Sequence, residues 1–393
     1  MEQYCDVVII GAGASGLLCG GLLAEAGISV TLLEKNARAG KKLSATGNGR
    51  CNFTNLHMDT DCYYGDAVWL RELLAEYPPE RIIRQFHKLG VYHREREGYV
   101  YPYTNQAVTV VEALQDYCRR GGVRVVTDCK AVSVRPAGDR YYVRTSQGEL
   151  GCRYLVLAAG GIAAAELGGS GSGYKLARSL GHRVHKTYPA LTGLQCGGDW
   201  WNRVAGTRVQ GRFSLRTDGR DLAGECGEIQ IVRDGVSGIP VFQLCRVAAE
   251  ALSAGGMVEG VIDFVPAMER TELRSWIGAH GIAGLVPKKW IPVLEGLSGS
   301  WRQLKEFTFP ILGTFGMERA QVTMGGIPTE ETNVETMESK MARNVYLTGE
   351  LLDVDGRCGG YNLHFAWSCA MAAAEAICQR EKGEGKNASD NAV

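Results

Sequence analysis

The sequence lacks an excess of either charge. Lysine plus arginine and aspartate plus glutamate number 43 each among 393 residues. Proteins that bind nucleic acid or anionic membranes normally attract them with a basic surface field, and balanced charge removes that field. We therefore expect no nucleic-acid partner, although a local basic face remains an alternative.

Long apolar runs and paired cysteines are also missing. No stretch approaches the ~20 apolar residues of a membrane span, and the first residues carry acids where a signal peptide carries bases. The 13 cysteines occur singly, without Cys-x-x-Cys pairs or the Cys/His spacing of zinc sites. These absences predict a cytoplasmic chain with reduced thiols, no membrane span and no metal site.

Glycine, by contrast, is abundant and clustered, with 52 residues. The first cluster follows an apolar strand at 7–10 and opens a helix over 15–26, before a second strand at 28–33. In this context Gly-x-Gly-x-x-Gly predicts a turn that binds a dinucleotide pyrophosphate at the helix N-terminus. Glu34, which ends the second strand, is placed to accept hydrogen bonds from ribose hydroxyls, which favours FAD or NAD over NADP.

Two later segments favour FAD over NAD. Residues 40–55 mix small residues, amide donors and cations, as expected of a loop lying along an extended dinucleotide. Residues 349–362 contain a second glycine pair and lead into an apolar helix at 363–376. A helix N-terminus there would stabilise negative charge that builds up on a reduced flavin.

The remaining pattern predicts two domains. Helices at 80–89 and 106–120, a hairpin at 91–102 and strands at 123–127, 131–135, 141–145 and 154–158 complete the first. The strand–helix–strand pattern then gives way to short strands and helices. We predict an FAD-binding domain from 1–188 and 324–393, an inserted β and helical substrate domain from 189–323 with its helical part at roughly 241–306, and a disordered polar tail at 381–393.

Three long motifs resemble those of BaiN/YhiN-type flavoproteins, also known as aminoacetone oxidase family FAD-binding enzymes. They are Lys42-Leu43-Ser44 through Asn55, Thr336 to Lys340, and Thr348 to Gly356 with Gly359 to Asn362. The resemblance covers nearly the whole chain. It implies an α/β fold, with a glutathione-reductase-type, Rossmann-like FAD domain and an inserted β-barrel-like plus helical domain.

The glycine turn and the resemblance together predict a set of cofactor-binding residues, and they assign no catalytic residue. The resemblance implies that a backbone group near Val132 lies at the adenine, and that Ala159 to Gly161 close over the flavin. It also implies that Gly168 to Gly173 approach FAD, with an NAD site there as the alternative. The predicted residues are Gly11, Gly13, Ala14, Ser15, Gly16, Glu34, Lys35, Lys42, Gly49, Arg50, Cys51, Asn52, Val132, Ala159, Gly160, Gly161, Gly349, Glu350, Asp353, Gly360, Tyr361, Asn362 and Leu363.

Several other residues have two interpretations. Cys51 and Cys358 fall in cofactor-lining segments, yet buried cysteine is usually a packing residue. His364 could donate to the flavin or be structural, and we favour the structural role. His182 and His185 are expected to be structural. The tyrosines at 92, 99, 101 and 103 could line a hydrophobic substrate pocket or lie on a half-exposed strand.

The sequence thus predicts an FAD-dependent oxidoreductase. The resemblance implies NAD(P)H as the hydride donor and a small hydrophobic substrate with a conjugated enone, such as a 3-oxo-Δ4 steroid or bile acid intermediate. An FAD-dependent amine oxidase, a flavin-dependent RNA-modifying enzyme and a non-catalytic flavin redox module remain alternatives. The oligomeric state is not predicted.

Overall fold

The computed structural model describes residues 3–297 and 300–390. The chain forms two compact units, one made of residues 1–187 and 322–393 and the other of residues 188–321. Each has its own cluster of buried apolar side chains. No helix among the described residues has the length and apolar character needed to cross a membrane.

A seven-stranded sheet forms the centre of the first unit. Its strand order is β7-β2-β1-β10-β9-β8, with β19 also paired to β10. Strands β1, β2, β7, β10 and β19 are parallel, so Val8 lies opposite both Thr31 and Leu155. The carboxyl ends of β1, β10 and β19 therefore meet at one edge, and each is followed by a glycine-containing turn. The strands are β1 (Gln3–Ile10), β2 (Val30–Leu33), β7 (Arg124–Val126), β8 (Ala131–Ala137), β9 (Arg140–Thr145), β10 (Gly148–Leu157) and β19 (Val345–Leu347).

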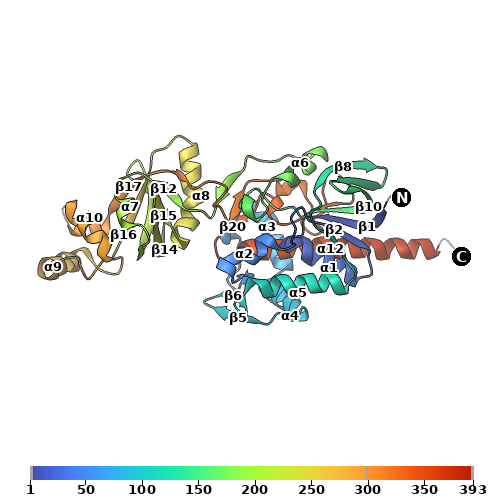
Figure 1. The fold of residues 1–393 in the computed structure, drawn as a ribbon, viewed down its shortest axis with the longest axis horizontal. Helices are drawn as coiled ribbons and strands as arrows, with labels where there is room; N and C mark the ends of the chain where they lie inside the picture. The colour runs from blue at the N-terminus through green and yellow to red at the C-terminus, as the bar shows by residue number, and fades with distance from the viewer. Residues whose placement is uncertain (1–2, 298–299, 391–393) are drawn as a thin grey trace. The chain divides into compact units, whose positions relative to one another are not determined.

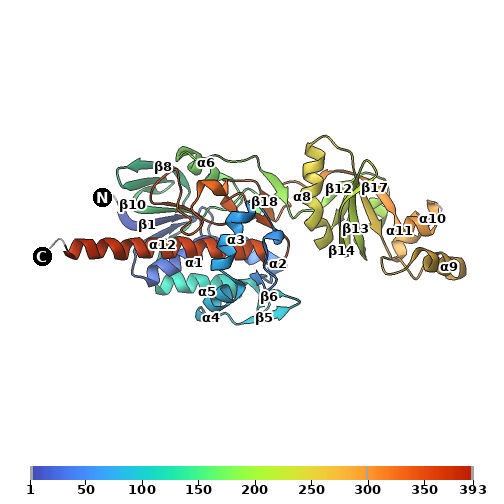
Figure 2. The same ribbon diagram turned by 180° about the vertical axis from the view of Figure 1, so that it is seen from behind.

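Three helices of the first unit pack side by side. Helix α1 (Ala14–Glu25) contacts both α5 (Ala107–Arg120) and α12 (Tyr361–Asp390) (Figure 1). Seen from behind, α12 is one continuous helix (Figure 2). The first helix of the chain and its last described helix thus pack against each other and contact strands of the same sheet.

Shorter elements complete this unit. They are α2 (Lys41–Gly49), β3 (Thr54–Asn55), β4 (Tyr63–Tyr64), α3 (Ala67–Glu76), α4 (Pro79–Lys88), β5 (His93–Arg96), β6 (Tyr99–Pro102), α6 (Ser172–Ser179), β18 (Val322–Met324) and β20 (Asp355–Gly356), with 3-10 turns at 60–62, 165–167, 329–331 and 349–351.

The second unit contains a closed barrel with strand order β12-β15-β14-β13-β16-β17. Aromatic side chains fill it, among them Trp201, Phe213 and Phe309, so the barrel is a packed core. Its elements are β11 (Tyr188–Ala190), β12 (Leu194–Cys196), α7 (Trp201–Val204), β13 (Arg208–Thr217), β14 (Arg220–Val232), β15 (Gly235–Ser237), α8 (Ile239–Ser253), β16 (Val258–Asp263), α9 (Arg270–His280), a 3-10 turn at 288–290, α10 (Ile291–Gly296), α11 (Trp301–Lys305) and β17 (Phe307–Thr314). The expected α/β fold with an inserted barrel and helices is confirmed.

Two expectations about local structure were wrong. The segment 40–55, expected as a loop, begins with α2, because Lys41 to Ala45 are compatible with a helix and only Thr46, Gly47 and Asn48 leave helical geometry. The tail, expected to be disordered from 381, continues α12 to Asp390, while residues 391–393 lie outside the described part. Glu381 accepts hydrogen bonds from Arg153 and the Tyr154 hydroxyl, both at 2.7 Å, which holds the helix where its polar extension begins.

Candidate cofactor site

Two of the three glycines in the β1–α1 turn are tightly packed, and the third is open. A Cβ on Gly16 would lie 1.9 Å from the Gly11 carbonyl oxygen, and a Cβ on Gly11 would lie 2.3 Å from the Ala158 carbonyl oxygen. Gly11 also has φ +110°, a conformation that favours glycine. A Cβ on Gly13 would meet nothing within 4 Å. Gly11 and Gly16 therefore serve close packing, and Gly13 leaves open space at the start of α1.

Within the described residues, no side chain caps the orphan donors at the start of α1. Its N-cap is Gly13, with no side-chain cap and no acid in the first turn, and the sequence continues with Ala14 and Ser15. The first N–H groups of a helix have no carbonyl within the helix to bind. Together with the partial positive charge of the N-terminus, they form a site that suits a phosphate group.

The turns after β10 and β19 converge on this helix start. The Thr348 hydroxyl lies 3.2 Å from Ser15 Oγ, and a Cβ on Gly349 would lie 3.1 Å from the same oxygen. Ala159 lies against Gly11, and a Cβ on Gly160, which has φ +68°, would meet nothing within 4 Å. The structure thus brings together three predicted segments that are far apart in the sequence.

The segment that contains Glu34 lies next to the segment 129–132, which ends at Val132. The Glu34 carboxylate accepts hydrogen bonds from the Ala12 N–H at 3.1 Å and from the Asn36 backbone and side chain at 2.9 and 2.6 Å. The backbone N–H of Cys129 donates to the Glu34 carbonyl oxygen, which places the start of β8 next to β2. Val132 itself lies at a register shift between Ala131 and Ser133, where the ladder to β9 is interrupted. Its backbone is therefore suited to contact a ligand. Lys35, the predicted residue that follows Glu34, has a pKa lowered by burial.

Lys42 and Glu350, separated by 308 residues, form an ion pair of 2.6 Å. The other carboxylate oxygen of Glu350 accepts the Thr323 N–H at 2.9 Å. Thr323 Oγ1 in turn accepts the backbone N–H groups of Ile162 and Ala163, at 2.8 and 2.9 Å. A Cβ on Gly161 would lie 2.3 Å from Thr323 Oγ1, so only glycine fits there.

Thr323 was not predicted. The sequence carries a signal, because the strand Val322–Met324 is followed by two glycines, and the strand that ends at Leu157 is likewise followed by a glycine pair at 160–161. From the sequence, this position marks only the predicted end of the inserted domain at 189–323.

The segment 49–55 lies against the start of α12. Asn55 Nδ2 donates to the Gly359 carbonyl oxygen at 2.9 Å. A Cβ on Gly360 would lie 2.6 Å from the Thr54 carbonyl oxygen and 2.9 Å from Asn52 Oδ1. Asn52 Oδ1 is buried and has no hydrogen-bond partner within the described residues. A buried acceptor without a partner is costly, so it marks a position where a ligand donor would be favourable.

Two predicted residues at the start of α12 already use their side chains within the protein. The Asn362 amide bonds both the N–H and the carbonyl oxygen of Gly356, each at 2.8 Å. The Tyr361 hydroxyl donates to the His57 carbonyl oxygen at 3.3 Å. Contact of these residues with a cofactor would therefore involve backbone groups, as it would for Leu363 in the same turn of the helix.

The tyrosines of the β5–β6 hairpin divide into two pairs. Tyr92 and Tyr103 are 65% and 67% exposed and lie 5.9 Å apart between ring centroids. A Cβ on Gly359 would lie 2.8 Å from Tyr99 Cε1. Burial raises the pKa of Tyr101, and the positive charge of Arg50 partly offsets this rise. Tyr99 and Tyr101 thus face the predicted cofactor segments, and the other two face solvent.

The two cysteines of the predicted site are unsuited to redox chemistry as they stand. Burial raises the pKa of Cys51 to about 12 and that of Cys358 to about 11. A thiol held in its neutral form is a poor nucleophile. This favours the packing role, and Cys51, at φ +57°, also forms the turn after Gly49 and Arg50.

The histidines have structural surroundings. Burial lowers the pKa of His364 to about 4, and its Nδ1 lies 2.8 Å from Thr54 Oγ1. His185 Nδ1 lies 2.7 Å from Asp353 Oδ2, so the carboxylate predicted for a ribityl hydroxyl already has one partner.

His182 lies in a buried serine–histidine–glutamate arrangement. Its Nδ1 is 2.8 Å from Glu331 Oε2, and its Nε2 is 2.8 Å from Ser339 Oγ. The order of groups matches a hydrolase triad. However, Ser339 Oγ also accepts the N–H groups of Met341 and Ala342, and all three side chains are buried. The arrangement therefore secures the chain around residue 339 and offers no accessible nucleophile.

Taken together, these residues fit an FAD molecule. The open space at Gly13 and the uncapped α1 N-terminus suit a pyrophosphate, and Glu34 suits a ribose. Near the start of α12, the Asn52 side-chain oxygen is buried and receives no hydrogen bond from the described residues. No cluster of metal-ligating side chains occurs in the described part of the chain.

Comparison with known proteins agrees with this architecture. The chain matches the family model "HI0933-like protein Rossmann domain" over residues 5–376. It is 36% identical to the 3-dehydro-bile acid delta(4,6)-reductase of Clostridium scindens, over 95% of this chain and 98% of that protein. It is 29% identical to the ribosomal RNA dihydrouridine synthase of Escherichia coli, over 95% of this chain and 98% of that protein.

A solved structure shares the fold. It is the 3-ketosteroid-Δ4-(5α)-dehydrogenase from Rhodococcus jostii RHA1 in complex with 4-androstene-3,17-dione, with a TM-score of 0.56 and 14% identity over 95% of this chain and 97% of that one. At this identity the likeness concerns the fold alone. The family match spans most of the chain, and the chain therefore belongs to the HI0933-like family of FAD-binding Rossmann proteins.

Proposed function

We propose that this protein is an FAD-dependent oxidoreductase that uses NAD(P)H to reduce a carbon–carbon double bond conjugated to a carbonyl group. One observation carries the proposal: a relative named for the reduction of a 3-dehydro bile acid is 36% identical over almost the full length of both chains. A 3-oxo group conjugated to a Δ4 double bond defines the substrate class. The preferred substrate is a small hydrophobic enone of the steroid type.

The chain's own residues support this chemistry by binding and orienting the cofactor. When bound, FAD would supply the chemistry of hydride transfer from NAD(P)H to one carbon of the double bond, and a proton from solvent would add to the other carbon. The α1 N-terminus at Gly13 would hold the pyrophosphate, and Glu34 would hold the ribose. The N-terminus of α12 would stabilise negative charge at the flavin, and Lys42, kept in place by Glu350, would add a cation beside it.

Tyr99 and Tyr101 would form the wall nearest the glycine pair at 359–360. Their rings are apolar and their hydroxyls are donors, so they suit a hydrophobic substrate with a carbonyl oxygen. Cys51 and His364, both fully buried and held neutral, would take no part in proton transfer.

A second substrate class is supported by a specific observation. The Escherichia coli relative acts, by its name, on uridine in ribosomal RNA, and it is similar over nearly the whole of this chain. The C5=C6 bond of uracil is also conjugated to a carbonyl, so one reductive site suits both classes. The equal numbers of basic and acidic residues weigh against an RNA substrate.

One experiment separates these possibilities. The purified protein, with its flavin content measured, is mixed anaerobically with NADH or NADPH while the visible flavin band is followed. We expect bleaching with at least one donor, and reoxidation when a 3-oxo-Δ4 steroid is added, with product mass increased by two hydrogen atoms. Protein-free FAD serves as the control.

The other outcomes are equally informative. No bleaching with either donor would overturn the reductase. Reoxidation only by uridine-containing RNA transcripts would move the substrate to the second class. Peroxide formation from an added amine without NAD(P)H would identify an amine oxidase. Bound flavin that bleaches with a donor yet is reoxidised by neither substrate class would leave only a redox module.

A further inference from the structure

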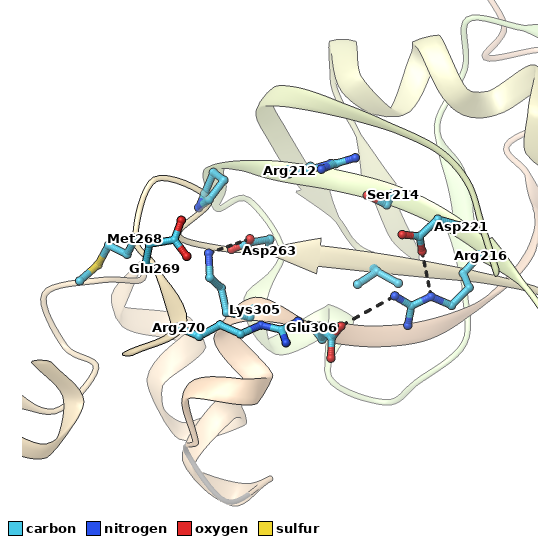
Figure 3. Close-up of a pocket in the computed structure, with 12 residues that line it drawn as sticks. Arg212, Ser214, Arg216, Asp221, Asp263, Met268, Glu269, Arg270, Lys305 and Glu306 are labelled. Carbon is cyan, nitrogen blue, oxygen red and sulfur yellow. Dashed lines mark hydrogen bonds and ion pairs between the residues drawn. The ribbon is translucent and has the colours of Figure 1, made fainter. Parts of the chain in front are cut away.

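A polar cavity of about 290 Å³ lies on the outer face of the barrel in the second unit (Figure 3). Strands β13 and β16 form its floor, and the segment 266–270 and the end of α11 form its rim. The side chains at 212, 214 and 216 alternate with the buried Phe213 and Leu215 along β13, so they share the outward face. This cavity belongs to one unit and shares no residue with the cofactor site described above.

Most charges on the cavity wall are already paired. Arg216 Nε lies 3.0 Å from Asp221, and its Nη2 lies 3.9 Å from Glu306. Lys305 Nζ lies 3.0 Å from Asp263 Oδ2 and donates to the Val265 carbonyl oxygen at 2.8 Å. Arg270 lies 3.7 Å from Glu306. These pairs neutralise one another and fix the wall.

Arg212 is different. Within residues 3–297 and 300–390 its guanidinium has neither an ion pair nor a hydrogen bond, although acids surround the cavity. Figure 3 shows it on the same strand as Ser214, apart from the dashed ion pairs. The Ser214 hydroxyl likewise has no hydrogen bond in the described part of the chain. Two donors that stand side by side on one strand are thus available to a ligand.

The strand opposite is shaped around these two donors. Gly224 on β14 pairs in register with Ser214. A Cβ at Gly224 would lie 2.6 Å from Ser214 Oγ and 2.9 Å from both Nε and Nη2 of Arg212. The missing side chain at Gly224 leaves room for the guanidinium of Arg212, which is exposed, to lie next to β14. A planar guanidinium presents paired N–H donors that match the two oxygens of a carboxylate or phosphate.

We propose that Arg212 and Ser214 form a binding site for the carboxylate or phosphate group of a small polar ligand. Lys305, 11% exposed and paired to Asp263, is held in the same wall, so Arg212 is the cation left for the ligand among the described residues that line the cavity. The wall also carries four acids, which repel anions. We therefore expect binding only of ligands whose anionic group contacts the guanidinium directly. The cavity volume is at the lower end for small-molecule sites, which matches a compact metabolite.

The test uses the full chain with its flavin and two probes, inorganic phosphate and acetate, titrated at constant ionic strength by calorimetry. We expect saturable binding of at least one probe, which also distinguishes phosphate from carboxylate. Arg212→Gln removes the charge and is expected to weaken binding at least tenfold. Gly224→Ala keeps the charge, displaces the guanidinium, and is expected to weaken binding to a similar degree.

The matched control is Arg208→Gln, on the same face of the same strand, where the arginine is paired to Glu228 at 2.9 Å. It should bind the probes as the unaltered protein does. Absence of saturable binding, or equal loss in Arg208→Gln and Arg212→Gln, would overturn the proposal. Thermal unfolding of each variant shows whether the barrel is intact, and Arg212→Lys provides a second variant that keeps the charge without the planar fork.

Discussion

In the first unit the predicted cofactor segments meet through backbone atoms and glycine, whereas in the second unit the cavity is walled by long charged side chains. Gly11, Gly16, Gly161 and Gly360 each lie where a Cβ would be within 2.6 Å of another atom. In the barrel, Arg216, Lys305 and Glu306 line the cavity with long charged side chains. A site built from close backbone contacts cannot adjust to an added atom, while a side-chain wall can. The two units should therefore respond very differently to single substitutions.

The sharpest contrast is within the glycine turn itself. Gly16→Ala places a Cβ 1.9 Å from the Gly11 carbonyl oxygen, so we expect a loss of at least about 3 kcal/mol in the free energy of unfolding and no retained flavin. Gly13→Ala adds the same atom to open space and should change stability by no more than about 1 kcal/mol. Its FAD dissociation constant should nevertheless rise at least about tenfold, because the methyl group occupies the proposed pyrophosphate position.

Urea unfolding and flavin titration of the apoprotein measure these two effects separately. Gly13→Ala that binds FAD as tightly as the unaltered protein would remove the pyrophosphate from this turn. Gly16→Ala with normal stability would contradict the packing described for β1 and α1.

The second largest effect is expected at His182. His182→Ala removes one hydrogen-bond partner of Glu331 and one of Ser339 in a buried site, and we expect a loss of about 2–4 kcal/mol in the free energy of unfolding. His185→Ala is the control, because that side chain is 53% exposed and should cost no more than about 1 kcal/mol. Chemical denaturation followed by circular dichroism measures both.

The same site also gives a functional test. Because Ser339 is buried and its oxygen accepts two N–H groups, we expect no adduct at Ser339 when the folded protein is treated with a fluorophosphonate. Labelling of Ser339 in the folded protein would show that the arrangement has an accessible nucleophile after all.

This contrast also explains what the sequence could and could not predict. The β1–α1 turn and Glu34 can be predicted as cofactor-binding residues because their proposed roles depend on neighbours close in sequence, and the parallel sheet follows from its strand–helix–strand order. The Lys42–Glu350 pair spans 308 residues, and no local pattern specifies it. His182, Glu331 and Ser339 likewise meet only through tertiary packing. The helix at 41–45 could not be predicted from the composition of the segment 40–55, because the glycines and asparagine at 47–49 indicate a loop. These residues follow the helical part of the segment.

Acid should reduce the difference in the free energy of unfolding between the unaltered protein and Glu331→Gln. Hydrogen bonds from Arg183 and His182 outweigh burial and hold the pKa of Glu331 below its ordinary 4.5. A carboxylate with a depressed pKa contributes stability that is fully present above pH 4.5 and is lost as pH falls through its folded value. We therefore expect the unaltered protein to be more stable by about 1 kcal/mol near neutral pH, and the difference to shrink below pH 4.5. Urea midpoints measured between pH 7 and pH 3.5 give this difference, and a gap that widens on acidification would contradict the sign of the shift.

The smallest effect is expected for Arg208→Gln in the barrel. Arg208 and Glu228 form a 2.9 Å pair, yet their side chains are 66% and 44% exposed. Solvent screens such a pair, and ordering two long side chains costs entropy, so the free energy of unfolding should change by no more than about 0.5 kcal/mol. The denaturation midpoint of the barrel variant should therefore coincide with that of the unaltered protein at both low and high salt. A loss above about 1 kcal/mol, or one that disappears in high salt, would mean that exposed ion pairs stabilise this barrel. The distinction between a rigid backbone site and an adaptable side-chain wall would then no longer separate the two units.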